Sequence, residues 1–469
     1  MKIGLFAIGL NTYWDQFDGL LDNLKGYHER ILNHISSFGV DVFDGGMVDD
    51  EKKAKDIGKA MIREEVDLVF LFISTYALSS TVLPVLKAVG KKVILLNIQP
   101  SAVLDFDAFN ALGDRGVMTG KWLENCQACS IPEIACVCKQ AGISYEIISG
   151  YLDEPNSMKE MEEWVRAFGV KQTMAENRVG ILGHYYSGML DVYSDVSRQA
   201  SVFGNHFQHL EMCELKEIRD RVSDDDVSKK MKEFEEMFRV SSECETKELE
   251  RAARTAVALD RLIEKHSLGS MAYYYEGVSG NPYEDIVTSV IAGNTLLTGR
   301  HVPIAGECEV KNVQAMKILD SLGIGGSFSE FYYTDYENDR VYLGHDGPAH
   351  LSIARDGVEL VPLSIYHGKP GNGLSIQMTV QDGPVTLLAV VEDGQEIKLM
   401  TAQGEAVKAP IFKIGNTNSA YEFSLSAKEF ISRWSKQGPS HHLAIGLGHH
   451  ASVIKKYAFL LGIECVEIC

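Results

Sequence analysis

The 469-residue sequence lacks several features that would direct a protein to particular partners. It has no apolar run long enough to cross a membrane, and its start, MKIGLFAIG, is typical of a first β-strand rather than of a signal peptide. Its 45 lysines and arginines are outnumbered by 65 aspartates and glutamates, which gives a formal net charge of −20. So acidic a chain is not expected to bind nucleic acid or an anionic membrane surface. These absences predict a cytoplasmic protein.

Motifs for nucleotide binding and serine hydrolysis are missing as well. GIGG at 323–326 lacks the spacing of a dinucleotide-binding loop, and GHDGP at 344–348 is not a P-loop. There is no G-x-S-x-G nucleophile motif. Phosphate, dinucleotide and serine-hydrolase chemistry therefore have little support.

The nine cysteines do not indicate a disulfide framework, since their number is odd and they are spread along the chain. Four are close together in CQACSIPEIACVC, at 126–138. The first pair could be half of a zinc site, but the second pair has a different spacing and no histidine flanks it. We interpret these four as small buried residues of a helix.

What the chain does contain, in its first third, is a series of apolar strand-like runs separated by helical patterns. The expected strands are 2–9, 67–74, 91–99 and 143–152, and the expected helices include 16–37 and 49–65. Strands that are apolar on both faces and alternate with helices predict a parallel sheet covered on both sides. A second unit of this kind begins near 177 with RVGILGHYY. A charged stretch, 224–269, predicts two amphipathic helices.

From about residue 325 the pattern changes to short strands separated by Gly and Asp-Gly turns. These expected strands are 358–368, 374–383, 384–394 and 395–404, and a helix at 451–461 closed by Gly462 leads to a last strand. We therefore predict an α/β fold with two doubly wound parallel-sheet domains and a C-terminal antiparallel, barrel-like domain. The expected domain limits are 1–170, 171–325 and 326–469.

Three polar clusters in the later half are candidates for chemistry: GECE at 306–309, the segment 327–347, and GPSHHLAIGLGHH at 438–450. Carboxylates and imidazoles without thiolates suit Mn²⁺, Mg²⁺ or Co²⁺. Other roles are open, because Glu307 could face the N-terminus of the following helix, while Glu330 and His345 could lie in turns. The clusters offer Glu307, Glu330, His345 and a choice among His441, His442, His449 and His450.

The order of these motifs resembles the L-arabinose isomerase and L-fucose isomerase superfamily, and the arabinose isomerase branch most. AGECEVK places Glu307, and SFSE places Glu330, at that family's two catalytic, metal-binding glutamates. YLGH and PSHH place His345 and His442 at its metal histidines, with His441 the rival of His442. His449 and His450 are expected at the start of the last helix.

The resemblance implies three domains with the site at their junction, and a divalent cation, Mn²⁺ in the first place. It also implies interconversion of a free aldose and ketose through a cis-enediol, with the two glutamates as acid and base. The expected assembly is a homo-oligomer, a trimer or hexamer, in which neighbouring subunits share each pocket.

The sugar-contacting motifs depart from the family pattern. GLNTYWD at 9–15 puts Asn11 and Tyr13 where the family has glutamine and leucine, and Tyr76 follows Thr75 where it has phenylalanine. In NCQACSIPE, Cys129 replaces the family histidine. We expect Asn11, Tyr13 and Tyr76 to contact the sugar, which could be L-arabinose, another pentose, a hexose or a deoxysugar.

Two other functions fit the same residues. One is a non-catalytic sugar-binding protein on the isomerase fold, although binding alone needs no proton-carrying glutamates. The other is a metal-dependent epimerase or aldolase, which would share the enediolate chemistry.

Overall fold

The computed structural model describes residues 2–276, 278–364, 371–394 and 396–469. The chain divides into two compact units, Met1–Gly169 and Val170–Cys469. Parallel-sheet α/β folding followed by an antiparallel barrel is observed, which confirms the predicted fold class. The division into three domains stays a prediction. In the described part of the chain, none of the helices is both long and apolar enough to span a membrane.

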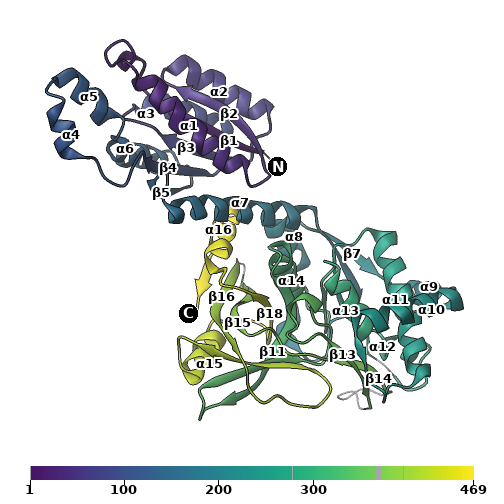
Figure 1. Cartoon of the computed structure of the whole chain (residues 1–469). Coiled ribbons are helices and arrows are strands. Elements are labelled where there is room, and N and C mark those ends of the chain that lie inside the picture. The colour runs from purple at the N-terminus through teal and green to yellow at the C-terminus, as the bar shows by residue number, and fades with distance from the viewer. Residues whose placement is uncertain (1, 277, 365–370, 395) are drawn as a thin grey trace. The chain divides into compact units, whose positions relative to one another are not determined.

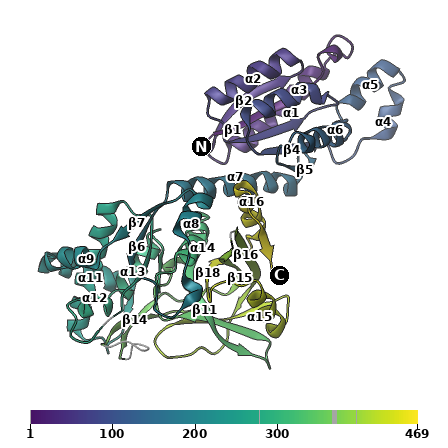
Figure 2. The same ribbon diagram turned by 180° about the vertical axis from the view of Figure 1, so that it is seen from behind.

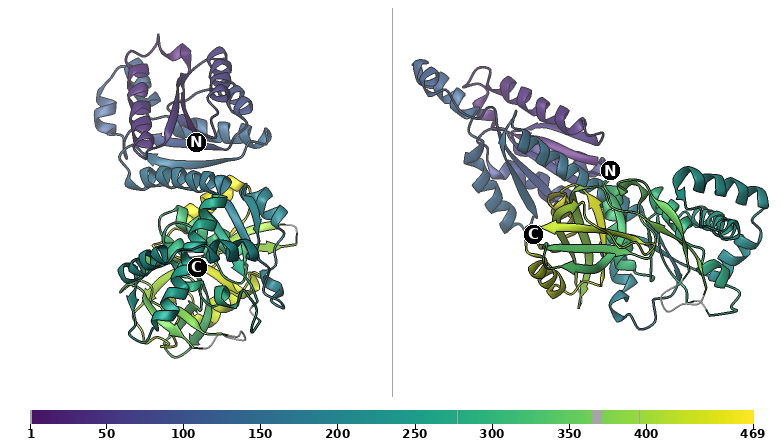
Figure 3. Two further views of the ribbon diagram at one scale, coloured as in Figure 1. Left: turned by 90° about the vertical axis from the view of Figure 1, so that its right-hand side faces the viewer. Right: turned by 60° about the horizontal axis from the view of Figure 1, so that its bottom comes forward.

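The first unit contains one parallel sheet with the strand order β2-β1-β3-β4-β5 (Figure 1). Helices lie on both sides of this sheet (Figure 3). Its strands are β1 (Lys2–Ile8), β2 (Asp41–Val48), β3 (Leu68–Ile73), β4 (Val93–Gln99) and β5 (Tyr145–Tyr151). Its helices are α1 (Leu20–Ser36), α2 (Glu51–Arg63), α3 (Ser79–Val89), α4 (Phe106–Ala111), α5 (Arg115–Leu123), α6 (Gln127–Gln140) and α7 (Pro155–Glu176). The last residues of α7 belong to the second unit. A short 3₁₀ helix, η1, covers Asn11–Tyr13.

The central strands of this sheet form because their side chains are apolar at nearly every position. All six residues of β3 are buried, and so are six of the seven residues of β1. Burial on both faces is what the uninterrupted apolar runs predicted. Strand β2 was not predicted, because DVFDGGMV carries two aspartates and two glycines and forms an edge strand that is only partly buried.

The second unit begins with a parallel sheet of order β10-β9-β6-β7. Its strands are β6 (Arg178–Gly183), β7 (His206–Leu210), β9 (Ser270–Tyr274) and β10 (Ile304–Ala305). The predicted pair of amphipathic helices is observed as α10 (Asp224–Met237) and α11 (Thr246–His266). The other elements of this part are η2 (Leu190–Val192), α8 (Val196–Phe203), α9 (Met212–Asp220), α12 (Glu284–Val287), α13 (Ile291–Gly299) and α14 (Val310–Ser321).

The antiparallel sheet of the second unit closes on itself. Its order is β15-β18-β11-β12-β17-β16-β19, and β15 also pairs with β16. The strands are β11 (Gly325–Asp335), β12 (Arg340–His345), β15 (Gly383–Asp393), β16 (Glu396–Val407), β17 (Thr417–Phe423), β18 (His442–Leu447) and β19 (Cys465–Glu467). Beside them are η3 (Leu351–Ile353), α15 (Ala427–Lys436) and α16 (Ala451–Leu461). Pairing of β15 with β16 makes the barrel that the sequence predicted.

A smaller sheet of order β14-β13-β8 completes the second unit. It contains β8 (Arg239–Val240), β13 (Glu359–Leu363) and β14 (Gly373–Gln377). The strand expected over 358–368 is observed at Glu359–Leu363, while 365–368 lie outside the described residues, as does residue 395 of the strand expected at 395–404.

Helix α14 lies at the centre of the second unit, beside β18 and β15 of the barrel (Figure 2). It also contacts β9 and β10 of the parallel sheet, so almost every one of its residues is buried. The turn that leads into α14 is therefore held where the parallel sheet meets the barrel. That turn carries Glu307.

Candidate functional site

Three of the predicted metal ligands lie close together on neighbouring strands of the barrel. Glu330 on β11 pairs directly with His442 at the start of β18. On its other side Glu330 pairs with Gly344, which immediately precedes His345 at the end of β12. Directly opposed residues of antiparallel strands share one face of the sheet. The ligand atoms of Glu330, His345 and His442 all lie within 4.8 Å of one another.

Glu307 reaches this cluster from the turn between β10 and α14. Glu307 and Cys308 have φ angles of 55° and 57°, which is the left-handed region that non-glycine residues rarely adopt. Each residue held in this region lowers the stability of the fold by on the order of 1–3 kcal/mol, so contacts of the surrounding structure must offset the loss. Hydrogen bonds from the Cys308 N–H to the Tyr273 carbonyl (3.0 Å) and from the Glu309 N–H to the Gly306 carbonyl (3.0 Å) hold the turn.

This strained turn directs the Glu307 carboxylate at two histidines. Its Oε2 lies 3.4 Å from His441 Nε2 and 3.5 Å from His442 Nε2. Glu307, His441 and His442 form a second group whose ligand atoms are within 4.8 Å of one another. Because the two groups share His442, all the predicted metal ligands and both rival histidines lie in one cluster.

A buried carboxylate orients the His442 ring. His442 Nδ1 lies 2.5 Å from Glu309 Oε2, and Ser440 Oγ donates a hydrogen bond to the other oxygen of Glu309. Glu309 is fully buried, so it fixes the proton of His442 on Nδ1 and leaves the lone pair of Nε2 directed toward Glu307. Within the described residues, His442 Nε2 and Glu307 Oε2 are buried and have no hydrogen-bond partner. Two buried donor atoms that face each other at 3.5 Å can hold a cation.

An aromatic ring packs between the two predicted metal histidines. The centroid of Phe328 is 4.2 Å from that of His345 and 4.4 Å from that of His442. The backbone of His345 is fixed by Thr417, whose hydroxyl accepts from the His345 N–H at 3.1 Å and donates to its carbonyl at 3.0 Å. Packing and hydrogen bonds together limit the orientations that these imidazoles can take.

His441 lies at the half-exposed side of the cluster, between the two glutamates. Its Nε2 is 3.4 Å from Glu307 and 3.8 Å from Glu330, and its Nδ1 is 2.6 Å from Asp191 Oδ2. Burial lowers the pKa of His441, but its interactions with the carboxylates of Glu307 and Asp191 outweigh it and raise the pKa to about 9. Burial raises the pKa of Glu330, opposed by the charges of His442 and His441. Both histidines of PSHH thus reach the site, so the choice between them stays open.

A turn, one alternative weighed from the sequence, does not describe Glu330 or His345. Glu330 lies within β11, and His345 is the last residue of β12. Glu307 lies two residues before Glu309, the N-cap of α14, so a role facing the N-terminus of this helix stays a prediction beside that of a metal ligand. His449 and His450 directly precede α16, as expected.

The predicted sugar contacts lie in the first unit, after adjacent strands. Asn11 and Tyr13 belong to η1, which follows β1, and Tyr76 follows β3. These strands are neighbours in the sheet, and β1 is where the strand order reverses, which is where open α/β sheets bind ligands. Tyr13 and Tyr76 both pack against a small core cluster that contains Cys126, and burial raises the pKa of Tyr13. Sugar binding by these residues stays a prediction.

The cysteine cluster is only partly as expected. Cys126 and Cys138 are buried, whereas Cys129 and Cys136 are exposed. Cys126 is the N-cap residue of α6, its side chain makes no capping hydrogen bond, and its Sγ lies 2.8 Å from that of Cys129. The interpretation as buried helix residues is therefore wrong for Cys129 and Cys136, because the outer face of α6 turns them to solvent.

Sequence reasoning missed the residues that support the site. The acidic residue in GECE marked Glu309, but nothing in its spacing showed that it would hold His442. Asp191 carried no signal, because it lies in the short 3₁₀ helix η2, far from PSHH in sequence. Lys311 donates to the Asp191 carbonyl and so links η2 to the first turn of α14.

The fold and the cluster of carboxylates and imidazoles together define a class of protein. Its members have parallel α/β sheets followed by a C-terminal barrel, and glutamates and histidines gather at that barrel. Residues 325–464 match the family model "L-arabinose isomerase C-terminal domain". The L-arabinose isomerase of Shouchella clausii is 19% identical over 72% of this chain and 69% of that protein. The L-arabinose isomerase of Bacillus subtilis is 23% identical over the same shares. The predicted resemblance to the arabinose isomerase superfamily is confirmed.

Replacing Glu309 tests whether it orients His442. We expect Glu309→Gln to weaken Mn²⁺ binding by about 10–100-fold, because an amide holds the Nδ1 proton of His442 less strongly than a carboxylate does. Isothermal titration of chelator-stripped protein measures this effect. Glu264→Gln, at an exposed position of α11, is the matched control. Equal affinities for Glu309→Gln and wild type would remove Glu309 from the site.

Proposed function

We propose that this protein is a metal-dependent isomerase that interconverts a free aldose and the corresponding ketose. The observation that carries the proposal is the convergence of two proton-carrying glutamates, Glu307 and Glu330, on the same two or three histidines. The similarity to L-arabinose isomerases supports it. A protein that only bound a sugar would have no use for a strained turn that directs a carboxylate at this cluster.

The residues of the cluster fit a divalent cation. Glu307 and Glu330 supply oxygens, and His345 and His442 supply nitrogens, a mixed set that suits Mn²⁺ and accepts Co²⁺ or Mg²⁺. The buried, unpartnered Glu307 Oε2 and His442 Nε2 are further support. When bound, the cation supplies Lewis acidity that polarises the sugar carbonyl and stabilises negative charge on the enediol oxygens.

The chain's own residues move the protons. Isomerisation transfers a proton between C1 and C2 through a cis-enediol, so one carboxylate must take the proton from carbon while an acid serves the neighbouring oxygen. We assign these two roles to Glu307 and Glu330, whose carboxylates face the same histidines. Glu309 keeps His442 in one tautomer, and Asp191 holds His441 beside both glutamates. Burial keeps water away from the inner side of the cluster, since His345 and His442 are almost fully buried.

The sugar remains to be named. Asn11, Tyr13 and Tyr76 replace the residues that the family pattern has at the sugar, so L-arabinose is one candidate beside other pentoses, hexoses and deoxysugars.

We also propose that the protein acts in the cytoplasm as a homo-oligomer, a trimer or hexamer with shared sites. Analytical ultracentrifugation tests the assembly, and a monomer would contradict it.

Removal of the metal is the direct test of the proposed function. Chelator-stripped protein is expected to lose at least about 99% of its activity, because carbonyl polarisation is lost, and Mn²⁺ is expected to restore it. The assay is chromatography of products from a panel of free aldoses and ketoses, with Mn²⁺, Co²⁺ or Mg²⁺ added back. Aldose-to-ketose conversion supports the proposal. Epimers or cleavage products would favour an epimerase or aldolase, and sugar binding without conversion would favour a binding protein.

A further inference from the structure

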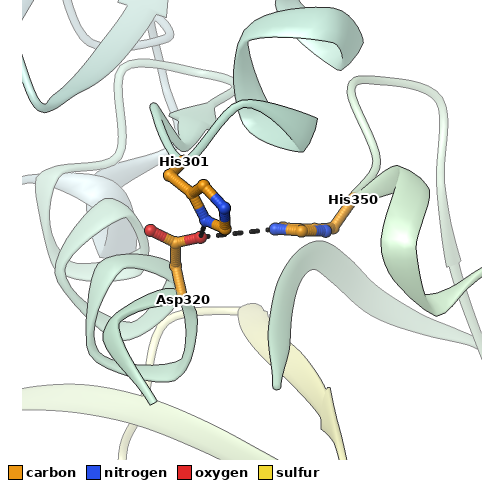
Figure 4. Close-up of side chains that lie close together, drawn as sticks. All are labelled: His301, Asp320 and His350. Carbon is orange, nitrogen blue, oxygen red and sulfur yellow. Dashed lines mark hydrogen bonds and ion pairs between the residues drawn. The ribbon is translucent and has the colours of Figure 1, made fainter. Parts of the chain in front are cut away.

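We propose that His301, Asp320 and His350 form a second divalent-cation site, one that takes a borderline ion such as Zn²⁺. The site shares no residue with the Glu307 cluster, and it does not depend on the proposed isomerase activity. Figure 4 shows both imidazoles directed at the carboxylate of Asp320 from two different loops. The ligand atoms of the three residues lie within 4.8 Å of one another.

The two imidazoles converge on a single oxygen of Asp320. His301 Nδ1 is 2.8 Å, and His350 Nε2 is 3.4 Å, from Asp320 Oδ1 (Figure 4). Asp320 and His350 are buried, whereas the His301 side chain is 72% exposed. Two imidazole nitrogens and one carboxylate oxygen with access to solvent are the ligand set of an open zinc site, in which water completes the coordination.

A neighbouring lysine holds the Asp320 carboxylate in place. Lys317 Nζ lies 3.0 Å from Asp320 Oδ2, the oxygen that faces away from the histidines, and donates to the His301 carbonyl at 2.8 Å. A cation can therefore bind Oδ1 while Lys317 continues to hold Oδ2.

Ser352 provides the supporting contact that a metal-binding histidine needs. Its Oγ lies 2.8 Å from His350 Nδ1, so it can accept the Nδ1 proton and leave the Nε2 lone pair directed at Asp320. The Ser352 backbone N–H, 3.3 Å from the same nitrogen, favours the other tautomer, in which His350 Nε2–H donates to Asp320. These two hydrogen-bond arrangements correspond to the metal-bound and metal-free states, and a cation would replace the Nε2 proton.

The three residues belong to the segments that lead to and from the Glu307 cluster. His301 lies between α13 and β10, shortly before Glu307, and has a φ of 66°, in the left-handed region. Asp320 is near the end of α14, the helix that follows Glu307. His350 lies in the segment after β12, which ends in His345. A cation at this site would cross-link these segments, so Zn²⁺ is expected to raise the thermal stability of the protein.

The variant that tests the site is His301→Asn. Asparagine tolerates a positive φ and the side chain of His301 is exposed, so the fold is expected to remain intact. His206→Asn, at an exposed histidine of β7, is the matched control. Full-length, chelator-stripped proteins are titrated with Zn²⁺ in competition with a chromophoric chelator, also in a Glu307→Gln background that weakens the other cluster.

Wild type and His206→Asn are expected to bind one more Zn²⁺ per chain than His301→Asn, or to bind it at least about tenfold more tightly. The difference must persist in the Glu307→Gln background. The rise in melting temperature with Zn²⁺ must also be smaller in His301→Asn than in His206→Asn. Equal stoichiometry and affinity in wild type and His301→Asn would overturn the site, as would an equal rise in melting temperature in the two variants.

Discussion

Glu307→Gln is expected to lower the turnover number by at least about a thousandfold without unfolding the protein. The amide has the shape of the carboxylate, so the strained turn and its backbone hydrogen bonds with Tyr273 and Gly306 are kept. An amide cannot carry a proton at neutral pH, and it is a weaker ligand for a hard cation than a carboxylate. General acid–base catalysis alone contributes about 10²–10⁴-fold, and weaker metal binding adds to the loss.

Two comparisons make this result specific. Glu264→Gln, the same substitution at an exposed position, is expected to leave turnover unchanged. Thermal unfolding of both variants checks that the fold is intact, since the side chain of Glu307 makes its contacts with histidines rather than with the apolar core. Full activity of Glu307→Gln would remove this residue from the mechanism and would leave its strained backbone without a functional explanation.

The second large effect is expected at the histidine pair. His442→Ala is expected to weaken Mn²⁺ binding by at least about 100-fold, because it removes the buried Nε2 ligand and leaves Glu309 Oε2 without the Nδ1 donor of His442. His441→Ala is expected to weaken Mn²⁺ binding by less than about tenfold. His441 is half-exposed, and its Nδ1 is hydrogen-bonded to Asp191.

The measurement is a titration of chelator-stripped protein with Mn²⁺, followed by the electron paramagnetic resonance signal of the free ion. His442→Gln keeps more of the buried volume than alanine does, so it separates loss of a ligand from loss of packing. A larger effect at His441 than at His442 would move the metal ligand by one position along PSHH. Equal affinities in both variants and wild type would place the cation elsewhere.

Much of the fold could be predicted from local patterns. The apolar runs of β1, β3 and β4, the two charged helices α10 and α11, and the Gly462 stop after α16 are each determined by nearby residues. Strand β2 was missed because its aspartates and glycines give it no alternation, and its place depends on pairing with β1. Barrel closure through β15 and β16 likewise depends on long-range pairing.

The candidate site was likewise predictable only in part from the sequence. The order of the glutamate and histidine motifs identified Glu307, Glu330, His345 and His442, but only the strand register explains why Glu330 lies opposite His442. Glu309 and Asp191 act through contacts between distant segments, for which no spacing rule exists. The cluster of His301, Asp320 and His350 was not found for the same reason, since its residues lie on two loops and a helix end.

In the proposed reaction, Glu307 and Glu330 transfer a proton between neighbouring carbons of a free sugar. The most direct test is NMR in D₂O of chelator-stripped protein, with and without Mn²⁺, on the sugar identified in the product panel. We expect metal-dependent isomerisation in which deuterium enters C1 or C2, and loss of this exchange in Glu307→Gln. Isomerisation at full rate with no deuterium in the product would contradict proton transfer through solvent-exchangeable carboxylates and would indicate a hydride shift instead.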